Sequence, residues 1–271
     1  MIKDITIGQF FPGKSAIHRL DPRIKLVLTV GLIVFVFVAN TAAAITLMTL
    51  AVAGTMALTR VPIKLYFKGL RPILIIVVFT SILNIFYFTQ GHVLLDLGFV
   101  KITDQGLLRS LLIAVRIACM ILISCILTYT TSPTQLTDAL ERLLSPLKVL
   151  HVKVHEIAMM MTIALRFVPT LLEETDKIMN AQKARGADME SGGLMQRMRA
   201  MIPILIPLFV SAFRRAFELA IAMECRCYHG GDGRTRMRQL HMQRLDFIAV
   251  GLAILLCAGV ILCNIYIPPA L

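Results

Sequence analysis

The feature that most constrains the fold is a long uncharged stretch near the start of the chain. Between Lys25 and Arg60 there is no charged residue, and most side chains are apolar. As a single helix this stretch would be about 50 Å long at about 1.5 Å per residue, whereas the hydrocarbon core of a bilayer is about 30 Å thick. The polar pair Asn40 and Thr41 interrupts the run. We therefore expect two membrane spans joined by a short turn, at about 24–39 and 42–59.

The composition of the whole chain supports a membrane protein. Of the 271 residues, 57% are hydrophobic, and the mean hydropathy is +0.78. A soluble domain of this size cannot bury so much apolar surface. Further apolar runs predict spans at about 72–89, 109–130 and 246–267. The expected fold is an all-α polytopic membrane protein with about five transmembrane helices.

Basic residues are distributed unevenly between the loops. The N-terminal segment and the 60–71 loop are rich in Lys and Arg, whereas the 90–108 loop has only Lys101 and residues 268–271 have none. Because basic loops stay on the cytoplasmic side, we expect a multi-pass protein of the cell membrane with its N-terminus inside and its C-terminus outside. The formal net charge of +12 then indicates contact with anionic lipid and acidic partners rather than nucleic acid.

The charges also separate the chain into three parts. We expect an N-terminal membrane bundle (1–131), a cytoplasmic part rich in charged residues (132–245) and a final transmembrane helix (246–271). In the middle part, Ser132-Pro133-Thr134-Gln135 is typical of a helix start with a capping box. Two long helices follow, at about 153–185 and 194–226, with prolines as expected kinks. They are too charged to span a membrane and too apolar for water, so we expect amphipathic helices that lie against the membrane.

Both long helices end in a single arginine between small residues. The first end reads Ala184-Arg185-Gly186 and the second Cys225-Arg226-Cys227. A cation at a helix C-terminus can simply complement the helix dipole. Alternatively, each arginine enters a pocket on a partner. In a hairpin of these helices the two arginines lie up to roughly 50 Å apart, too far to share one small-molecule site.

Three segments of the sequence resemble those of a known protein family. The segments GQFFPGKSAIHRLDPRIKL, KARGAD and AMECRCYHGGDGRTRMR are similar to the transmembrane T component of energy-coupling factor (ECF) transporters, which are ABC-type importers of vitamins and transition metals. The resemblance covers nearly the whole chain. The second motif departs from the usual Ala-Arg-Gly of the family but keeps its arginine.

The resemblance implies a scaffold subunit. Its long helices are coupling helices that dock onto two ABC ATPase subunits, and its apolar surfaces hold a substrate-binding S component. The T component itself binds no nucleotide, cofactor or vitamin and is not an enzyme. Arginine suits docking because its planar fork can pair bidentately with a carboxylate and stays charged on burial. The expected ATPase-docking residues are Ala184, Arg185, Gly186, Cys225, Arg226 and Cys227.

Other chemistry has weaker support in the sequence. Cys225, Cys227 and His229 have no second pair of ligands at a zinc-like distance, so we expect no metal site. The T component that this chain resembles binds no ATP, so we expect no ATP hydrolysis by this chain. Arg116 inside the fourth span either has a function or snorkels to the outer surface. The alternative function is a self-sufficient transporter with its own substrate path, which would need more polar residues within the spans.

Overall fold

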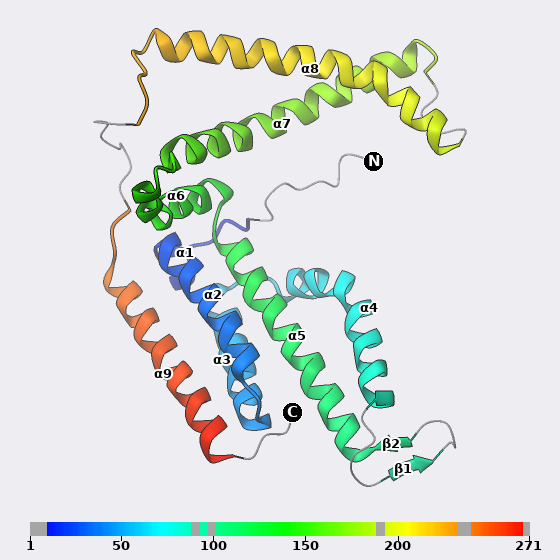
Figure 1. Ribbon diagram of the computed structural model, residues 1–271, viewed down its shortest axis with the longest axis vertical. Helices are drawn as coiled ribbons and strands as arrows, with labels where there is room; N and C mark the ends of the chain where they lie inside the picture. Colours follow the sequence, from blue (N-terminus) through cyan, green and yellow to red (C-terminus); the bar gives the residue numbers. More distant parts are fainter. Residues whose placement is uncertain (1–9, 88–92, 97–100, 188–192, 232–239, 268–271) are drawn as a thin grey trace. The chain divides into compact units, whose positions relative to one another are not determined.

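The computed structural model describes residues 10–87, 93–96, 101–187, 193–231 and 240–267. The chain divides into two compact units. The bundle unit comprises Gly8–Ala139 and Gln239–Leu271, and the arm unit comprises Met1–Ile7 and Leu140–Arg238. The described fold is all-α apart from one short antiparallel strand pair, as expected from the sequence (Figure 1).

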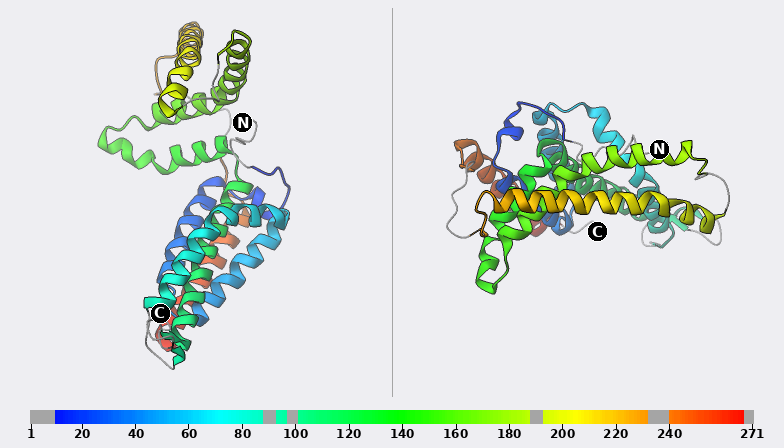
Figure 2. Two further views of the ribbon diagram at one scale, coloured as in Figure 1. Left: turned by 90° about the vertical axis from the view of Figure 1, so that its right-hand side faces the viewer. Right: turned by 90° about the horizontal axis from the view of Figure 1, so that it is seen from above.

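The long helices of the bundle unit run lengthwise beside one another (Figure 2). The elements of this unit are α1 (Ala16–Arg19), α2 (Pro22–Val38), α3 (Ala42–Thr59), α4 (Ile63–Tyr87), β1 (Val93–Asp96), β2 (Lys101–Thr103), α5 (Asp104–Thr130) and α9 (Arg244–Tyr266). Helix α6 (Pro133–Leu143) crosses the boundary between the units. The arm unit contains a 3-10 helix, η1 (Ser145–Leu150), and the long helices α7 (Val154–Ala184) and α8 (Leu194–Glu224).

Six of the described helices are long and apolar enough to cross a membrane by length and composition: α3, α4, α5, α7, α8 and α9. The expectation that α7 and α8 are too charged to span is therefore wrong by composition, because each contains an 18-residue window with few charges. Helix α2, with 17 residues, is not in this set. Among the described residues, large apolar side chains cover the outside of the bundle. Leu50, Ile75 and Leu255, for example, are 72%, 75% and 71% exposed. Such a surface is stable against lipid tails and unstable against water.

The bundle core lies where α2, α3, α5 and α9 meet. Val36, Met48, Ile123 and Val260 are almost fully buried there, one from each of these helices. Small residues allow the helices to approach closely. A Cβ added at Gly259 of α9 would lie 3.1 Å from a methyl group of Leu47 on α3, so a larger residue there would require the Leu47 side chain to shift.

The predicted break after the first span is present and is closed by side chains from other helices. Helix α2 ends at Val38, and the Thr41 hydroxyl caps α3 by accepting from Ala44 N at 3.2 Å. Asn264 of α9 accepts from Asn40 N at 3.1 Å, and its amide donates to the Val38 carbonyl at 2.6 Å. These contacts satisfy the polar groups that the turn exposes.

Helix α9 is also held to α2 at its other end. The Asp246 side chain is fully buried and accepts from the backbone N of Asp21 at 2.8 Å and of Gln243 at 2.7 Å. The second bond belongs to the capping box that starts α9. Arg23 beside it donates to the Leu240 carbonyl at 2.8 Å. The last helix is therefore fixed to the first long helix by polar contacts at both ends.

Two helices begin earlier than the sequence predicts. Helix α4 starts at Ile63 rather than at residue 72, and Pro72 lies inside it. Figure 1 shows that α4 is bent. A proline inside a helix removes one hydrogen bond and kinks the helix without ending it here. Helix α5 starts at Asp104 rather than at 109, because the Thr103 hydroxyl caps it by accepting from Gly106 N at 3.2 Å.

Helix α6 starts with the predicted capping box, in the part of the helix that belongs to the bundle unit. Ser132 N donates to the Gln135 side chain at 3.2 Å, and Gln135 N donates to the Ser132 hydroxyl at 3.3 Å. Both reciprocal bonds of the box are therefore present. Within the arm unit, His155 at the start of α7 contacts Glu141 at 2.9 Å between Nδ1 and Oε1. This contact connects the end of α6 to the start of α7.

Helices α7 and α8 are antiparallel neighbours (Figure 1, Figure 2). Glu174 of α7 accepts from the Ser211 hydroxyl and from Arg215 Nη2, the latter at 3.1 Å, and both donors belong to α8. This three-residue contact marks where the helices meet. Most large apolar side chains described on α8 are exposed, so a single neighbour does not cover its apolar face.

Candidate functional site

Helix α7 ends in a Schellman motif, in which the chain turns through a left-handed residue. Gly186 N donates to the Lys183 carbonyl at 3.0 Å, and Ala187 N donates to the Gln182 carbonyl at 3.0 Å. Gly186 has φ +86°, the left-handed conformation that glycine adopts without steric cost. Arg185 is the last residue before this turn.

Helix α8 ends in the same hydrogen-bond pattern. Cys227 N donates to the Glu224 carbonyl at 2.8 Å, and Tyr228 N donates to the Met223 carbonyl at 3.1 Å. Cys227 takes the left-handed position with φ +54°. Arg226 therefore lies at the same point of the motif as Arg185. The two sequence motifs, which differ in their small residues, produce one backbone geometry.

This geometry presents both arginines outward. All six residues of the two motifs are exposed. Among the described residues, neither guanidinium has a hydrogen bond or an ion pair. A guanidinium in this state keeps its full set of donors for a partner.

The two ends lie far apart within the arm unit. From Glu174, where the helices meet, α7 continues for about 16 Å to Arg185, and α8 continues for about 16 Å from Arg215 to Arg226, at about 1.5 Å per residue. The antiparallel helices carry these ends in opposite directions (Figure 1). The arginines are therefore roughly 30 Å apart. The separation is below the upper limit expected from sequence because the helices meet partway along their lengths.

The structure also places the candidate metal ligands and Arg116, which the sequence analysis considered. Cys225, Cys227 and His229 are exposed, and no group of three or more metal-ligating side chains occurs in the part of the chain that the structure describes. Arg116 of α5 donates through Nη2 to the Ala39 carbonyl at the end of α2. It therefore satisfies a backbone group in the turn between α2 and α3, a role that its position in a span does not reveal.

Sequence reasoning did not identify Asn264 as a residue that organises the bundle. Its partners in the turn between α2 and α3 lie more than two hundred positions earlier in the chain. The sequence feature that could have indicated this role is a single amide side chain near the end of an apolar span, where leaving its polar atoms without hydrogen bonds is costly.

The apolar bundle and the number of helices long enough to cross a bilayer define the class as multi-pass membrane protein. Comparison with known proteins identifies the family. The CbiQ family model, described as cobalt transport protein, matches residues 13–237.

Curated relatives specify the family further. The energy-coupling factor transporter transmembrane protein EcfT of Ruminiclostridium cellulolyticum is 53% identical over 262 residues, covering 97% of this chain and 98% of the relative. The proteins of the same name from Clostridium kluyveri and Bacillus subtilis are 48% and 49% identical, covering 97% and 89% of this chain and 96% and 91% of the relatives. The chain belongs to this family of transmembrane energy-coupling components of ECF transporters, which confirms the resemblance to the T component.

Proposed function

We propose that this protein is the scaffold of an ECF-type importer, linking two cytoplasmic ABC ATPase subunits to a membrane-embedded S component for the uptake of vitamins or other micronutrients. The N-terminus and the arm unit are cytoplasmic and the C-terminus is outside. The observation that carries the proposal is the repeated helix end, in which Arg185 and Arg226 occupy equivalent positions of two Schellman motifs.

The equivalent C-terminal ends of α7 and α8 fit two similar partner subunits. A pair of ATPase subunits offers two related grooves, and a separation of roughly 30 Å between the arginines prevents both from entering one groove. Each guanidinium can form a bidentate pair with a carboxylate in its groove. Ala184 and Gly186 at one end, and Cys225 and Cys227 at the other, are small enough to let the partner backbone approach.

The apolar face of α8 supports the second partnership. Met198, Phe209, Phe213 and Phe217 are between 62% and 72% exposed and recur at helical spacing, which aligns them in a stripe along the helix. Methionine side chains adapt to differently shaped surfaces. Such a stripe suits an apolar partner, and we assign it to the S component and surrounding lipid.

In this function the chain transmits force and performs no chemistry. ATP hydrolysis belongs to the partner ATPases, and substrate recognition belongs to the S component. Residues 8–15 (GQFFPGKS) have the GxxxxGK[ST] spacing, but the helix that follows them, α1, has only four residues, whereas a phosphate loop leads into a longer helix. Purified alone and reconstituted in vesicles, it should take up no substrate. Uptake by the chain alone would instead identify a self-sufficient transporter.

The docking is tested by reversing each arginine in the complete complex. We expect Arg185→Glu and Arg226→Glu each to weaken ATPase association by about 30-fold or more, because breaking a buried charge pair costs about 2 kcal/mol or more. The double variant should lose the ATPases on co-purification and lose transport. Arg→Lys variants should have smaller effects, because the charge remains and the fork is lost.

Arg166→Glu with Arg214→Glu is the matched control. These arginines are exposed on the same two helices, one on each, and lie away from the helix ends. The control changes the net charge by the same amount and should retain the ATPases. Co-purification of the ATPases at normal yield with the Arg185→Glu/Arg226→Glu variant would refute the docking.

A further inference from the structure

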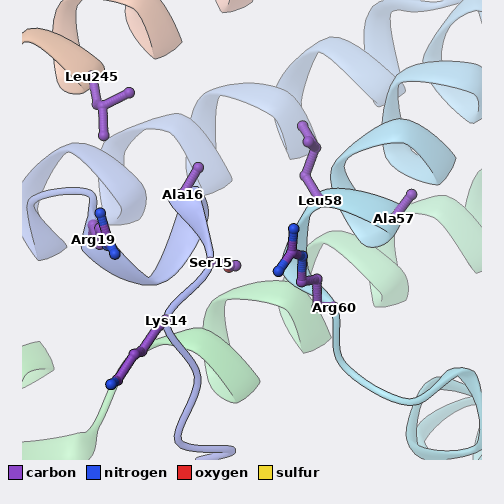
Figure 3. Close-up of a pocket in the computed structure, with 8 residues that line it drawn as sticks. All are labelled: Lys14, Ser15, Ala16, Arg19, Ala57, Leu58, Arg60 and Leu245. Carbon is purple, nitrogen blue, oxygen red and sulfur yellow. The ribbon is translucent and has the colours of Figure 1, made fainter.

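A pocket of about 480 Å³ lies at one end of the bundle unit (Figure 3). It is formed by the segment around α1, the last turn of α3 and its following residue, and the first turn of α9. The side chains that matter for its chemistry are Lys14, Arg19, Ala57, Leu58, Arg60 and Leu245. The pocket belongs to neither motif at the ends of α7 and α8.

The pocket has a strong positive charge. Lys14, Arg19 and Arg60 line it, and no carboxylate does. All three cations are exposed, and among the described residues their side chains have no ion pair. The nearest carboxylates in the sequence are engaged elsewhere: Asp21 pairs with Arg23 at 3.1 Å, and Asp246 accepts from backbone amides. A multivalent anion is therefore the ligand that this lining favours.

The backbone at Arg60 is unusual for its residue type. Arg60 ends α3 with φ +56° and ψ +21°, a left-handed conformation that glycine adopts at lower cost. The residue at this strained position carries a guanidinium, and Figure 3 shows this group beside Leu58 and Ser15 at the pocket. The left-handed turn that ends α3 thus places this guanidinium at the pocket.

The other wall of the pocket is apolar. Ala57 and Leu58 belong to the last turn of α3, and Leu245 to the first turn of α9, and both helices are long and apolar enough to span a bilayer. Leu58 is 60% exposed and Leu245 is 37% exposed. The pocket thus lies where apolar helices give way to charged segments, at the depth where lipid phosphates are found. A soluble phosphate would use only the cationic side of this lining.

We propose that this pocket binds the phosphate of an anionic phospholipid, with Lys14, Arg19 and Arg60 around the headgroup and the acyl chains along α3 and α9. Basic pockets at the ends of membrane helices recognise such headgroups. A volume of about 480 Å³ accommodates a headgroup but not a whole lipid, so the chains continue along the outer surface. The inference is independent of ATPase docking, because it concerns the chain without partners.

A single tryptophan makes the binding measurable. The chain contains no Trp, so Leu245→Trp places one reporter in the pocket. The full chain carrying it is reconstituted in vesicles of phosphatidylcholine with increasing dibrominated phosphatidylglycerol, whose bromine atoms quench nearby tryptophan. A parallel series uses dibrominated phosphatidylcholine. We expect phosphatidylglycerol to bind the pocket at least about fivefold more tightly than phosphatidylcholine, since each nearby cation contributes about fivefold.

Variants separate the pocket from the general charge of the protein. Lys14→Gln/Arg19→Gln should lower the preference for phosphatidylglycerol roughly 25-fold or to the phosphatidylcholine level. Arg60→Gly should lower it roughly fivefold without backbone strain. The control Lys68→Gln/Arg71→Gln removes the same charge from exposed positions of α4 outside the pocket and should leave the preference unchanged.

Three results would overturn the proposal. Equal quenching by the two brominated lipids would exclude a headgroup preference. Equal losses in the control and the pocket variants would assign the preference to surface charge. Relief of the quenching by millimolar inorganic phosphate at constant ionic strength would assign the pocket to a soluble anion.

Discussion

The left-handed residues that end α7 and α8 allow one experiment to be worked out in detail. Gly186 has φ +86° and Cys227 has φ +54°, at equivalent positions of equivalent motifs. We expect opposite effects from exchanging their residue types. Cys227→Gly should strengthen the end of α8, and Gly186→Ala should weaken the end of α7.

The magnitude follows from the surroundings of each residue. A Cβ added at Gly186 would have nothing within 4 Å, so the cost of Gly186→Ala is conformational and not steric. A side chain in the left-handed region costs about 1–2 kcal/mol, and the greater freedom of glycine in the unfolded chain offsets about 0.4–1 kcal/mol of this. Each exchange should therefore change the local stability by roughly 0.5–1 kcal/mol, with opposite signs.

Hydrogen exchange of single amides measures this local stability in the folded protein. The amides of Ala187 and Tyr228 donate the longest-range bonds of the two motifs, so their exchange reports the opening of each end. A change of 0.5–1 kcal/mol corresponds to roughly a two- to fivefold change in protection. Protection of Tyr228 should rise by this factor in Cys227→Gly, and protection of Ala187 should fall by it in Gly186→Ala.

Gly186→Asn is the control, because asparagine has a side chain but tolerates the left-handed conformation. Its effect should be smaller than that of Gly186→Ala. If both substitutions reduce protection equally, the effect comes from adding a side chain and not from the backbone. If Cys227→Gly leaves Tyr228 unchanged, the assignment of strain to Cys227 is wrong.

Two further predictions concern the bundle unit. Burial, together with repulsion from Lys25, lowers the pKa of His18 from its ordinary value of 6.5. The neutral ring therefore stabilises the folded segment above pH 6.5. This stabilisation is lost as the pH falls through the lower pKa of the folded state. Hydrogen exchange across residues 11–18 should therefore accelerate at pH 5.5 relative to 7.5 after correction for intrinsic rates, and His18→Asn should remove the difference. Asn264→Leu should destabilise the chain by about 2 kcal/mol in detergent unfolding, because it leaves polar groups of the turn between α2 and α3 unpaired. Among the described residues, Asn84→Leu removes only a bond to the Thr80 carbonyl of the same helix, so it should cost under about 1 kcal/mol, and equal costs would contradict this account.

The sequence predicted helix starts and ends well where they depend on interactions between residues close together in the chain. The Ser132 to Gln135 capping box needs only residues three positions apart, and both of its hydrogen bonds are present. The polar pair at Asn40 and Thr41 broke the longest apolar run, and Thr41 caps the next helix. The ends of α7 and α8 followed from glycine and small residues after long periodic segments.

Other features depend on contacts or conformations that a local pattern does not encode. Lys64 and Lys68 were placed in a loop because charges disfavour the membrane, yet a helix can extend beyond the bilayer and carry them in its first turns. The left-handed backbone of Cys227 could not be anticipated, since cysteine has no preference for it. The pocket at Arg60 joins three segments that are distant in the sequence, so its cations were seen only as basic loops.

The contacts of Asn264 have a consequence for how the protein is made. The polar groups between α2 and α3 are synthesised more than two hundred residues before their partner, so Asn264 emerges from the ribosome well after them. Until Asn264 is present, the polar groups of the turn between α2 and α3 must stay hydrated, because lipid tails offer them no hydrogen-bond partner. Insertion of α9 thus completes the hydrogen bonds of the turn between α2 and α3. A prematurely terminated chain that lacks α9 keeps this turn hydrated and exposed, and quality-control proteases can recognise it.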